Sequence, residues 1–434
     1  MEIKNRREFL KVTGLAAAGG MLTLNACSTG APLAAGTPVS PDVKLKVGLI
    51  GCGGRGTGAA NQALSADPNV ELIAVADIFE DKPTESLNLL SMRHGDKVNV
   101  PEENIFIGFD AYQKVIDSGI DVVLLAGPSR FRPKHLEAAV DAGLHIFCEK
   151  PVAVDAPGAR RVYETVRKAK EANLSIVGGL CWRYEYPKRA FYDRILDGAV
   201  GEIRSIYNTY NTGAARVIES NQNWTEAQHQ VRNWIYYNWL SGDHIVEQAV
   251  HSIDFMQWAM GDQYPISAVG TGGRQVRTED IYGNIYDHFA ITYQYANGAK
   301  GFHFSRQQPN CENSYMAEII GTDGIGVAPA SGEHIIRARR EWIYDGEENQ
   351  MYQTQHDELF ASIRQGRPIN DGEFITTSTM LAIMGRMAAY TGREITWEQA
   401  LNSTESLGPE IHEWDDVIPI SSLSVAMPGV TEFI

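Results

Sequence analysis

The glycine-rich segment at residues 51–56 restricts most strongly what this chain can fold into. Residues 44–50 alternate between polar and apolar types and run directly into Gly51, Gly53 and Gly56, and residues 57–65 then have helical character. A buried strand, a tight glycine turn and a helix, in that order, are typical of the first βαβ unit of a dinucleotide-binding fold.

Each glycine of this segment has a physical reason for its position. Gly51 permits the tight turn, Gly53 lets the backbone approach a pyrophosphate, and Gly56 lets the helix pack closely on the strand. The start of the helix, at Gly54 and Arg55, presents free N–H groups to the phosphates. These five residues are the first predicted cofactor contacts.

A carboxylate follows at the distance that such a fold requires. Residues 70–76 have the pattern of a second strand, and Asp77 ends it, 21 residues after Gly56. Asp77 is predicted to accept hydrogen bonds from the ribose hydroxyls of the adenosine. Its charge would repel a 2′-phosphate, which favours NAD, although Lys82 nearby leaves NADP as the alternative. The other role open to Asp77 is to cap the next helix.

Further strands and helices alternate along the first third of the chain. Strands are predicted at 121–126 and 144–148, and helices at 112–118 and 133–142. This alternation predicts a doubly wound parallel sheet, the Rossmann form of an α/β fold, covered by helices on both faces.

Two loops follow the strands that end at the ligand-binding edge of such a sheet. Gly127 and Pro128 open the first loop, where the nicotinamide end of a dinucleotide would lie. Glu149, Lys150 and Pro151 open the second. A lysine there can approach a substrate hydroxyl or bind its developing alkoxide. The alternative is a surface salt bridge between Glu149 and Lys150.

The amino end has the pattern of a targeting signal. Arg6 and Arg7 precede a weakly apolar, Gly/Ala-rich run, as in a twin-arginine (Tat) export signal, and residues 24–27 resemble a lipoprotein cleavage box that ends in Cys27. A transmembrane anchor is the alternative, but about 13 apolar residues cannot span a hydrocarbon core of roughly 30 Å. We expect a signal at 1–27, a flexible linker at 28–42, a periplasmic location and a lipid anchor on Cys27.

Composition excludes two classes of site. The net charge of −16 leaves no basic stripe to bind nucleic acid. The five cysteines are scattered without the spacing of a zinc site or of a disulfide framework.

The glycine turn, Asp77 and the Glu149-Lys150-Pro151 triplet together resemble the glucose–fructose oxidoreductase/inositol dehydrogenase (Gfo/Idh/MocA) family over roughly residues 44–400. The resemblance implies a Rossmann domain at 43–172 and a substrate-binding α+β domain at 173–400 with a large open, mainly antiparallel sheet. Residues 401–434 are then a C-terminal extension. It also implies that Lys150 lies by the nicotinamide and the substrate as a catalytic or substrate-orienting residue.

The family also has an acidic residue four positions before a histidine, and Glu247 and His251 match that spacing. Spacing i, i+4 places both on one helical face, where His251 can accept a proton. The family more often has aspartate at the first position, so the role of Glu247 is less certain than that of His251. The alternative for His251 is a core histidine paired to a neighbour.

The second half of the chain is predicted to be rich in strands. They are expected at 174–180, 203–209, 266–271, 288–295, 299–306 and 316–321, with a helix at 187–196 and a hairpin turn at Asn297-Gly298. The predicted substrate contacts, besides His251, are Trp182, Arg183 and Tyr184, which lie where the resemblance implies that the substrate pocket begins. Trp234 and Tyr236 are added because aromatic faces stack on sugar rings. A packed loop that buries these aromatic side chains is the alternative.

His244, Glu247, His251 and Asp254 share a helical stripe that could in principle ligate a metal. The family chemistry needs no metal, and the apolar neighbours of the stripe fit a core-packed helix equally well. No metal site is therefore predicted.

An exported protein meets little free NAD, so the cofactor is expected to stay tightly bound. We expect an exported NAD(P)-dependent oxidoreductase that acts on a sugar, glycoside or polyol. One alternative is redox-neutral cleavage of a glycoside. Exported NAD-dependent glycosidases related to the family follow that scheme but lack the triplet lysine that this chain keeps. A non-catalytic sugar-binding lipoprotein is the other alternative. The family's open sheets also pair between subunits, which implies a homo-oligomer.

Overall fold

The computed structural model describes residues 35–418 and 424–434. In this part of the chain, one sheet has six parallel strands in the order β3-β2-β1-β4-β5-β6. Its strands are β1 (Leu45–Ile50), β2 (Val70–Asp77), β3 (Ile105–Ile107), β4 (Val122–Leu125), β5 (His145–Cys148) and β6 (Ile176–Gly178). The strand order reverses between β1 and β4, and in open α/β sheets the ligand binds at the carboxyl edge at such a point.

Alternate side chains of the parallel strands enter two different cores. Val122 and Leu124 of β4 pack into one cluster, and Val123 and Leu125 pack into the other. The helices of this part are α1 (Gly54–Ala66), α2 (Asp81–His94), α3 (Ala111–Ile116), α4 (Arg132–Asp141) and α5 (Ala156–Glu171). Helix α11 (Met351–Gln365), far along the chain, joins α1 in the first core through Leu359.

The strand predicted at 174–180 belongs to this first sheet. The middle of this predicted segment forms β6, which pairs with β5 in parallel. Strand β6 lies after residue 172, the predicted domain boundary. The Rossmann sheet therefore extends past that boundary. The reason is that α5 ends at Glu171 and returns the chain to the sheet edge for one more parallel strand.

A second sheet has nine strands within the described residues, in the order β14-β13-β12-β11-β7-β10-β9-β8-β15. They are β7 (Ile203–Thr212), β8 (Ser267–Gly273), β9 (His288–Gln294), β10 (Lys300–Gln307), β11 (Ser314–Gly321), β12 (Ile325–Pro329), β13 (Ile335–Arg337), β14 (Trp342–Ile343) and β15 (Ile395–Thr396). Only β7 and β10 pair in parallel there. The predicted fold class is confirmed, and the predicted turn at Asn297-Gly298 joins β9 to β10, with Gly298 at φ +87°.

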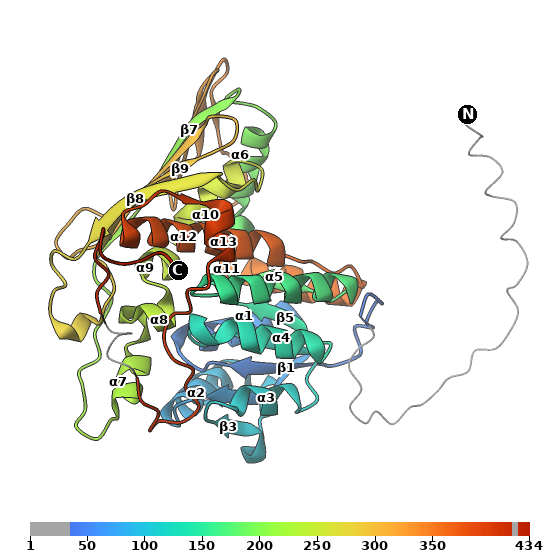
Figure 1. Ribbon diagram of the computed structural model, residues 1–434. Helices are drawn as coiled ribbons and strands as arrows, with labels where there is room; N and C mark the ends of the chain where they lie inside the picture. Colours follow the sequence, from blue (N-terminus) through green and yellow to red (C-terminus); the bar gives the residue numbers. More distant parts are fainter. Residues whose placement is uncertain (1–34, 419–423) are drawn as a thin grey trace, which may run out of the picture. The chain divides into compact units, whose positions relative to one another are not determined.

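Helices cover one face of the second sheet (Figure 1). They include α6 (Tyr186–Leu196), α10 (Val250–Ala259) and α12 (Gly372–Thr391). Helix α10 approaches β10 so closely that a Cβ on Gly301 would lie 1.9 Å from the sulfur of Met256. Helix α12 is buried along almost its whole length. No helix in the described ranges is long and apolar enough to cross a membrane.

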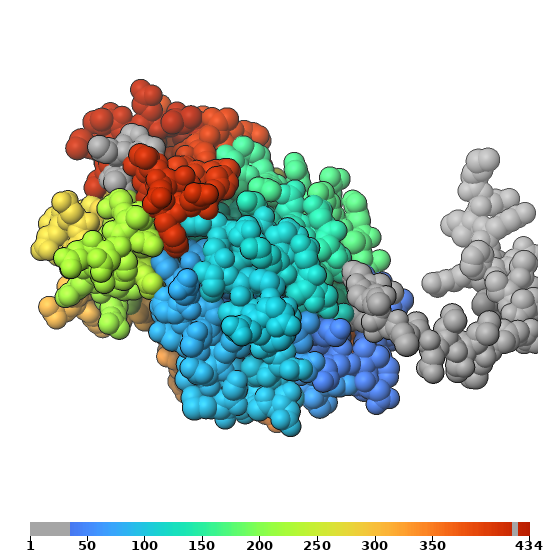
Figure 2. All heavy atoms as spheres, turned by 90° about the horizontal axis from the view of Figure 1, so that it is seen from below, coloured from blue at the N-terminus to red at the C-terminus, as the bar shows by residue number. Residues whose placement is uncertain are grey.

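The remaining helices are short and lie in the connections of the second half of the chain. They are α7 (Glu226–Arg232), α8 (Asn238–Ser241), α9 (His244–Glu247) and α13 (Trp397–Asn402). After α13 the chain leaves the second sheet, and Figure 2 shows this dark red segment lying against the blue surface of the Rossmann part. Its apolar residues Leu407, Ile411 and Ile418 are buried.

Candidate active site

The glycine turn has the geometry that its sequence predicts. Gly51 has φ +95°, and a Cβ on Gly56 would lie 1.8 Å from the carbonyl oxygen of Gly51. By contrast, a Cβ on Gly53 would meet nothing within 4 Å. The turn is therefore closed on its protein side and open where Gly53, the N-cap of α1, faces outward. An open backbone before free helix N–H groups suits a pyrophosphate.

Asp77 ends β2 beside this turn. Its carboxylate accepts hydrogen bonds from the backbone N–H groups of Cys52, at 2.7 Å, and Phe79, at 3.1 Å. Burial raises the pKa of Asp77, and these two N–H groups oppose the shift. Asp77 does not cap α2, whose N-cap residue is Glu80. It braces the glycine turn and remains partly exposed.

A hollow opens along the carboxyl edge of β1, β2, β3 and β4. It is lined by Ile50, Gly51, Ala76, Asp77, Ile78, Gly108, Phe109, Ala111, Tyr112, Gly127, Pro128, Phe131 and His135. The predicted residues Gly51, Asp77, Gly127 and Pro128 thus share one hollow. Its apolar walls and single carboxylate fit the adenosine end of a dinucleotide. Gly127 and Pro128, expected at the nicotinamide end, therefore share a hollow with Asp77 instead.

Arg55 and Glu149 are paired with each other. The Nε of Arg55 lies 2.6 Å from a carboxylate oxygen of Glu149, and the guanidinium also donates to Gln62. The other carboxylate oxygen of Glu149 accepts the backbone N–H of Lys150 at 3.1 Å. The pair fixes the loop that carries Lys150. The alternative of a surface salt bridge between Glu149 and Lys150 is not found, because Glu149 pairs with Arg55.

Lys150 instead reaches across to the second domain. Its Nζ donates to the carbonyl oxygen of Glu247 at 2.6 Å and to a carboxylate oxygen of Glu247 at 3.0 Å. An ammonium group has three N–H donors, so one remains without a partner among the described residues. Lys150 precedes a cis peptide bond to Pro151. The side chains of Lys150 and Glu247 are 14% and 10% exposed, so the pair is largely shielded from water but still reachable.

His251 lies close to this pair. Burial and the nearby Lys150 ammonium lower the pKa of His251 well below its ordinary value of 6.5, so the imidazole is neutral. Its Nδ1 is buried and makes no hydrogen bond in the described part of the structure. The ring of Trp182 lies 5.1 Å from that of His251 and stacks on Phe255 at 4.6 Å. A neutral imidazole has one ring nitrogen that can accept a proton.

The expectation that Glu247 and His251 lie on one continuous helix is wrong. Helix α9 ends at Glu247 and α10 begins at Val250, with Gln248 and Ala249 between them. In a continuous helix, the Glu247 carbonyl would accept a hydrogen bond from a backbone N–H of the next turn. Because the helix is interrupted, this carbonyl accepts from Lys150 instead. The side chain of Gln248 is meanwhile held by Gln307 of β10, at 2.5 Å.

The break also disperses the stripe of four potential metal ligands. His244 bonds the backbone carbonyl of Tyr286, at 3.1 Å. Asp254 is paired with Arg183, at 2.8 Å, and accepts a hydrogen bond from Ser378. No group of three or more potential metal ligands occurs in residues 35–418 and 424–434.

Three predicted substrate contacts are interior residues. Arg183 is buried between Asp254 and Asp262, and the Tyr184 hydroxyl donates to Asp371 at 2.6 Å. Tyr236 is fully buried, and its hydroxyl donates to the carbonyl of Ala215. At Tyr236, therefore, the structure agrees with the alternative interpretation, a packed loop that buries its aromatic side chains.

Of the predicted substrate residues, Trp182 stays beside His251 and Trp234 packs on a hydrophobic cluster. Trp182 and Arg183 separate because they lie on a short 3-10 helix, Cys181–Tyr184, which points successive side chains in different directions. Trp234 is partly buried and packs against the cluster that contains Tyr237 and Trp239.

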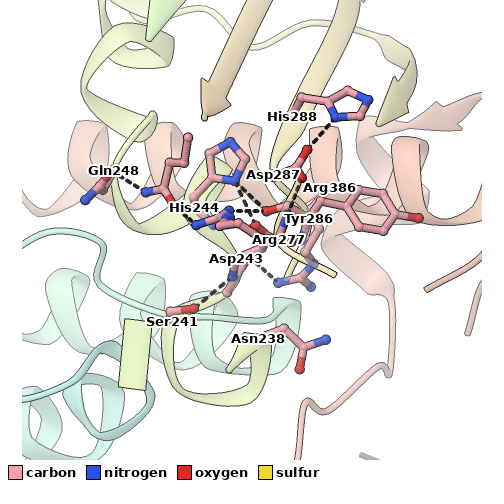
Figure 3. Close-up of polar contacts among 12 residues, drawn as sticks. Asn238, Ser241, Asp243, His244, Gln248, Arg277, Tyr286, Asp287, His288 and Arg386 are labelled. Carbon is pink, nitrogen blue, oxygen red and sulfur yellow. Dashed lines mark hydrogen bonds and ion pairs between the residues drawn. The ribbon is translucent and has the colours of Figure 1, made fainter. Parts of the chain in front are cut away.

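A buried polar network that the sequence did not reveal holds α9 in place (Figure 3). At its start, the carboxylate of Asp243 accepts the backbone N–H groups of His244 and Tyr286 and the hydroxyl of Tyr390, at 2.5–2.7 Å. Asp243 has φ +75°, a strained conformation outside glycine. An aspartate before a short helix is a capping signal, but its other partners lie far away in the sequence.

The same network reaches the other end of α9. Arg277 donates to the Tyr286 carbonyl at 2.6 Å and to Gln307, which in turn donates to Gln248. Glu247 lies between Asp243, which is bonded to Tyr286 and to Tyr390 of α12, and Gln248, which is bonded to β10, so the chain is fixed on both sides of the residue that holds Lys150. Asp287 braces the neighbouring turn by accepting three backbone N–H groups and pairing with His288 (Figure 3).

Two family models match this chain. One, described as the oxidoreductase family with an NAD-binding Rossmann fold, matches residues 45–176. The other, the GFO/IDH/MocA C-terminal domain, matches residues 189–326. Together they cover more than half of the 434 residues.

Individual relatives are distant but extensive. The inositol 2-dehydrogenase of Rhizobium meliloti (strain 1021) is 22% identical over 341 residues, 76% of this chain and 92% of that protein. Among solved structures, the aldose-aldose oxidoreductase from Caulobacter crescentus, complexed with glycerol, has a TM-score of 0.65 at 18% identity and covers 82% of this chain and 100% of its own. A levoglucosan dehydrogenase in complex with NADH and levoglucosan has a TM-score of 0.63 at 20% identity, over 82% of this chain and 99% of its own. The structures share the fold.

Proposed function

Because this chain belongs to the Gfo/Idh/MocA family of NAD-binding oxidoreductases, we propose that it oxidises a CH–OH group of a sugar, glycoside or polyol. The similar proteins named above act, by their names, on inositol, aldoses and levoglucosan, which are all polyhydroxylated rings or their open forms. The observation that carries the proposal is the Lys150–Glu247 pair with a neutral His251 beside it, at the carboxyl edge of the NAD-binding sheet.

The proton chemistry follows from the two side chains. The free N–H of Lys150 donates to the substrate hydroxyl oxygen and stabilises the negative charge that develops there. His251 is neutral, and because its Nδ1 is buried, its Nε2 is the ring nitrogen that takes the hydroxyl proton. Bound NAD supplies the acceptor for the hydride that leaves the same carbon. Glu247 holds the ammonium group in place through two bonds, so Lys150 needs no reorganisation during the reaction.

Trp182 supplies an apolar wall beside these polar groups. Its indole is braced by Phe255 and lies next to His251. A sugar ring has an apolar C–H face that packs on an aromatic ring and polar hydroxyl edges that need hydrogen bonds. A Trp182 ring beside His251 suits that combination.

The proposal extends to the cell compartment and to the state of the cofactor. Residues 1–27, with Arg6, Arg7 and Cys27, lie outside the described residues, and their sequence supports Tat export and lipid attachment. An exported enzyme would then keep NAD as a resident group. Cell fractionation and labelling with a palmitate analogue, with Cys27→Ala as the control, test export and lipidation separately.

The open face of the second sheet supports assembly into a homo-oligomer. Tyr207 and Phe304 lie on adjacent strands with ring centroids 5.5 Å apart, and they are 39% and 38% exposed. Exposed paired aromatics on a sheet favour an interface. Analytical ultracentrifugation of the wild type and of Phe304→Asp measures this: an unchanged monomeric mass in both contradicts assembly.

The activity test uses the purified holoenzyme and a panel of polyols, aldoses and glycosides without added NAD. Reduced nicotinamide absorbance on the protein after one compound is added supports dehydrogenation. Release of nitrophenol from a nitrophenyl glycoside, with no net reduction, supports redox-neutral cleavage instead. Bound NAD with neither signal across the panel contradicts the proposed reaction.

A further inference from the structure

The segment after α13 lies against the adenosine end of the proposed nucleotide site. Trp414 stacks on Phe79 with ring centroids 5.0 Å apart and 19° between the rings, and its edge meets Phe109 at 4.8 Å. Phe79 follows Asp77 after β2, and Phe109 follows β3. Both loops belong to the carboxyl edge of the sheet, where the adenosine half of a dinucleotide binds.

This segment is anchored along its length. The backbone N–H of Leu407 donates to Asp155 at 3.0 Å, and Asp155 also caps α5. Glu405 pairs with the buried Arg386 at 2.9 Å. Gly408 packs on Trp239 so closely that a Cβ there would lie 2.4 Å from the Trp239 side chain.

A tight turn presents the indole of Trp414. The carboxylate of Asp416 accepts the backbone N–H groups of His412, at 2.6 Å, and Glu413, at 3.0 Å. These bonds hold the chain in the loop that carries Trp414 over Phe79. Both of these bonds lie within the turn, so Asp416 acts on the site through the turn.

The second domain also contributes a residue, Arg232, that packs on Phe79. The guanidinium of Arg232, at the end of α7, lies 3.9 Å from the ring centroid of Phe79 and pairs with Asp81 at 2.9 Å. Phe79 is therefore held by Trp414 and by Arg232, which come from two segments outside the Rossmann part. Phe109 lines the hollow that contains Asp77 and also a neighbouring groove bordered by residues 409–413.

We propose that residues 405–418, the C-terminal strap, close the adenosine end of the site, with Trp414 as the residue that retains the nucleotide. The inference rests on the proposed use of NAD and goes beyond it, because it names how the cofactor is kept. Adenine leaves the hollow past the loops of Phe79 and Phe109, and the strap ties both loops through one indole. Release then requires the stacked rings to separate.

Trp414→Ala tests the strap through the rate of NADH release from the holoenzyme. Release is followed by the loss of NADH fluorescence when excess NAD⁺ displaces it. We expect release at least about 10-fold faster in the variant, equivalent to about 1.4 kcal/mol. Trp414→Phe, which keeps a ring, should release NADH at close to the wild-type rate.

Asp416→Ala provides an independent test at a partly exposed position whose carboxylate bonds lie within the turn. It should loosen the turn and accelerate release to a smaller extent than Trp414→Ala. Wild-type release rates in both variants, with NAD bound normally, would overturn the strap and leave the oxidoreductase proposal intact. Failure of the wild-type protein to bind NAD at all would instead overturn the proposed function.

Discussion

The two ends of the proposed active site are built in different ways. At the nucleotide end, Gly51, Gly53 and Gly56 shape the backbone within six consecutive residues. At the substrate end, Lys150 depends on Glu247, 97 residues away, and Glu247 depends on the network that begins at Asp243. The first end uses local backbone conformation, and the second uses side chains that tertiary packing brings together. Substitutions at the two ends should therefore differ in how they change kcat, the affinity for NAD and the stability of the fold.

Lys150→Met should have the largest effect. It removes the ammonium that faces the substrate, so kcat should fall by roughly 10²–10⁴-fold, while the dissociation constant for NAD changes little. Steady-state kinetics and calorimetric titration with NAD measure the two quantities. Lys168, whose side chain on α5 is 49% exposed, gives the matched control: Lys168→Met should behave as wild type. Wild-type turnover in Lys150→Met would contradict the catalytic assignment.

Gly56→Ala and Gly53→Ala form a matched pair at the nucleotide end. Gly56→Ala should cost about 3 kcal/mol of folding stability, since its Cβ collides with the Gly51 carbonyl. Gly53→Ala meets no protein atom within 4 Å, so its melting temperature should be unchanged while NAD affinity falls about 10-fold. Thermal melts with and without NAD distinguish the two, and equal behaviour would contradict an open pyrophosphate cradle at Gly53.

Asp243→Ala probes the support of the substrate end. It leaves three donors without their acceptor, so we expect about 3 kcal/mol of lost stability. Tyr390→Phe, which removes one of these bonds, should cost about 1 kcal/mol. Urea denaturation gives both values. If the network also positions Glu247, Tyr390→Phe should lower kcat more than it weakens NAD binding.

The pH dependence of catalysis should show the smallest effect. His251 has a lowered pKa in the folded protein, so its neutral, proton-accepting form persists as the pH falls below 6.5. Activity should be lost only as the pH falls through that lowered pKa. The acidic limb of kcat/KM should therefore lie below pH 6.5, and a limb at or above 6.5 would mean that His251 is not the base or is not buried near Lys150. Lys150→Met should raise the pKa of His251, because a neighbouring positive charge is gone.

The same difference explains which features could be predicted from the sequence: local backbone features could, and contacts between distant segments could not. The strands and helices of the Rossmann part follow hydrophobic periodicity, and the turns at Gly51 and Gly298 follow from glycine conformation. The stripe from His244 to Asp254 kept helical periodicity, yet the helix breaks at Gln248, where a side-chain bond to Gln307 stabilises the interruption. Nothing local distinguishes the two outcomes, because the partner lies 59 residues away.

Aromatic and charged side chains gave the least reliable sequence predictions. Trp182, Arg183 and Tyr184 are consecutive and were assigned one role, but only Trp182 lies beside His251. Arg183 is buried because Asp254 and Asp262 neutralise it, and a buried charge is tolerated only with such partners. The C-terminal extension likewise carried no motif, and its contact with Phe79 depends on the completed fold.

The sequence by itself determined the dinucleotide fold. It also indicated NAD, through Asp77, and it pointed to Lys150 and His251 as the candidate catalytic residues. These depend on local backbone conformation and on short spacings, which a sequence records directly. Tertiary structure alone decided that Glu247 holds Lys150, that Arg183 is interior, and that Trp414 lies over Phe79. Those contacts join segments far apart in the chain, and their geometry exists only after the two sheets and the C-terminal strap have packed together.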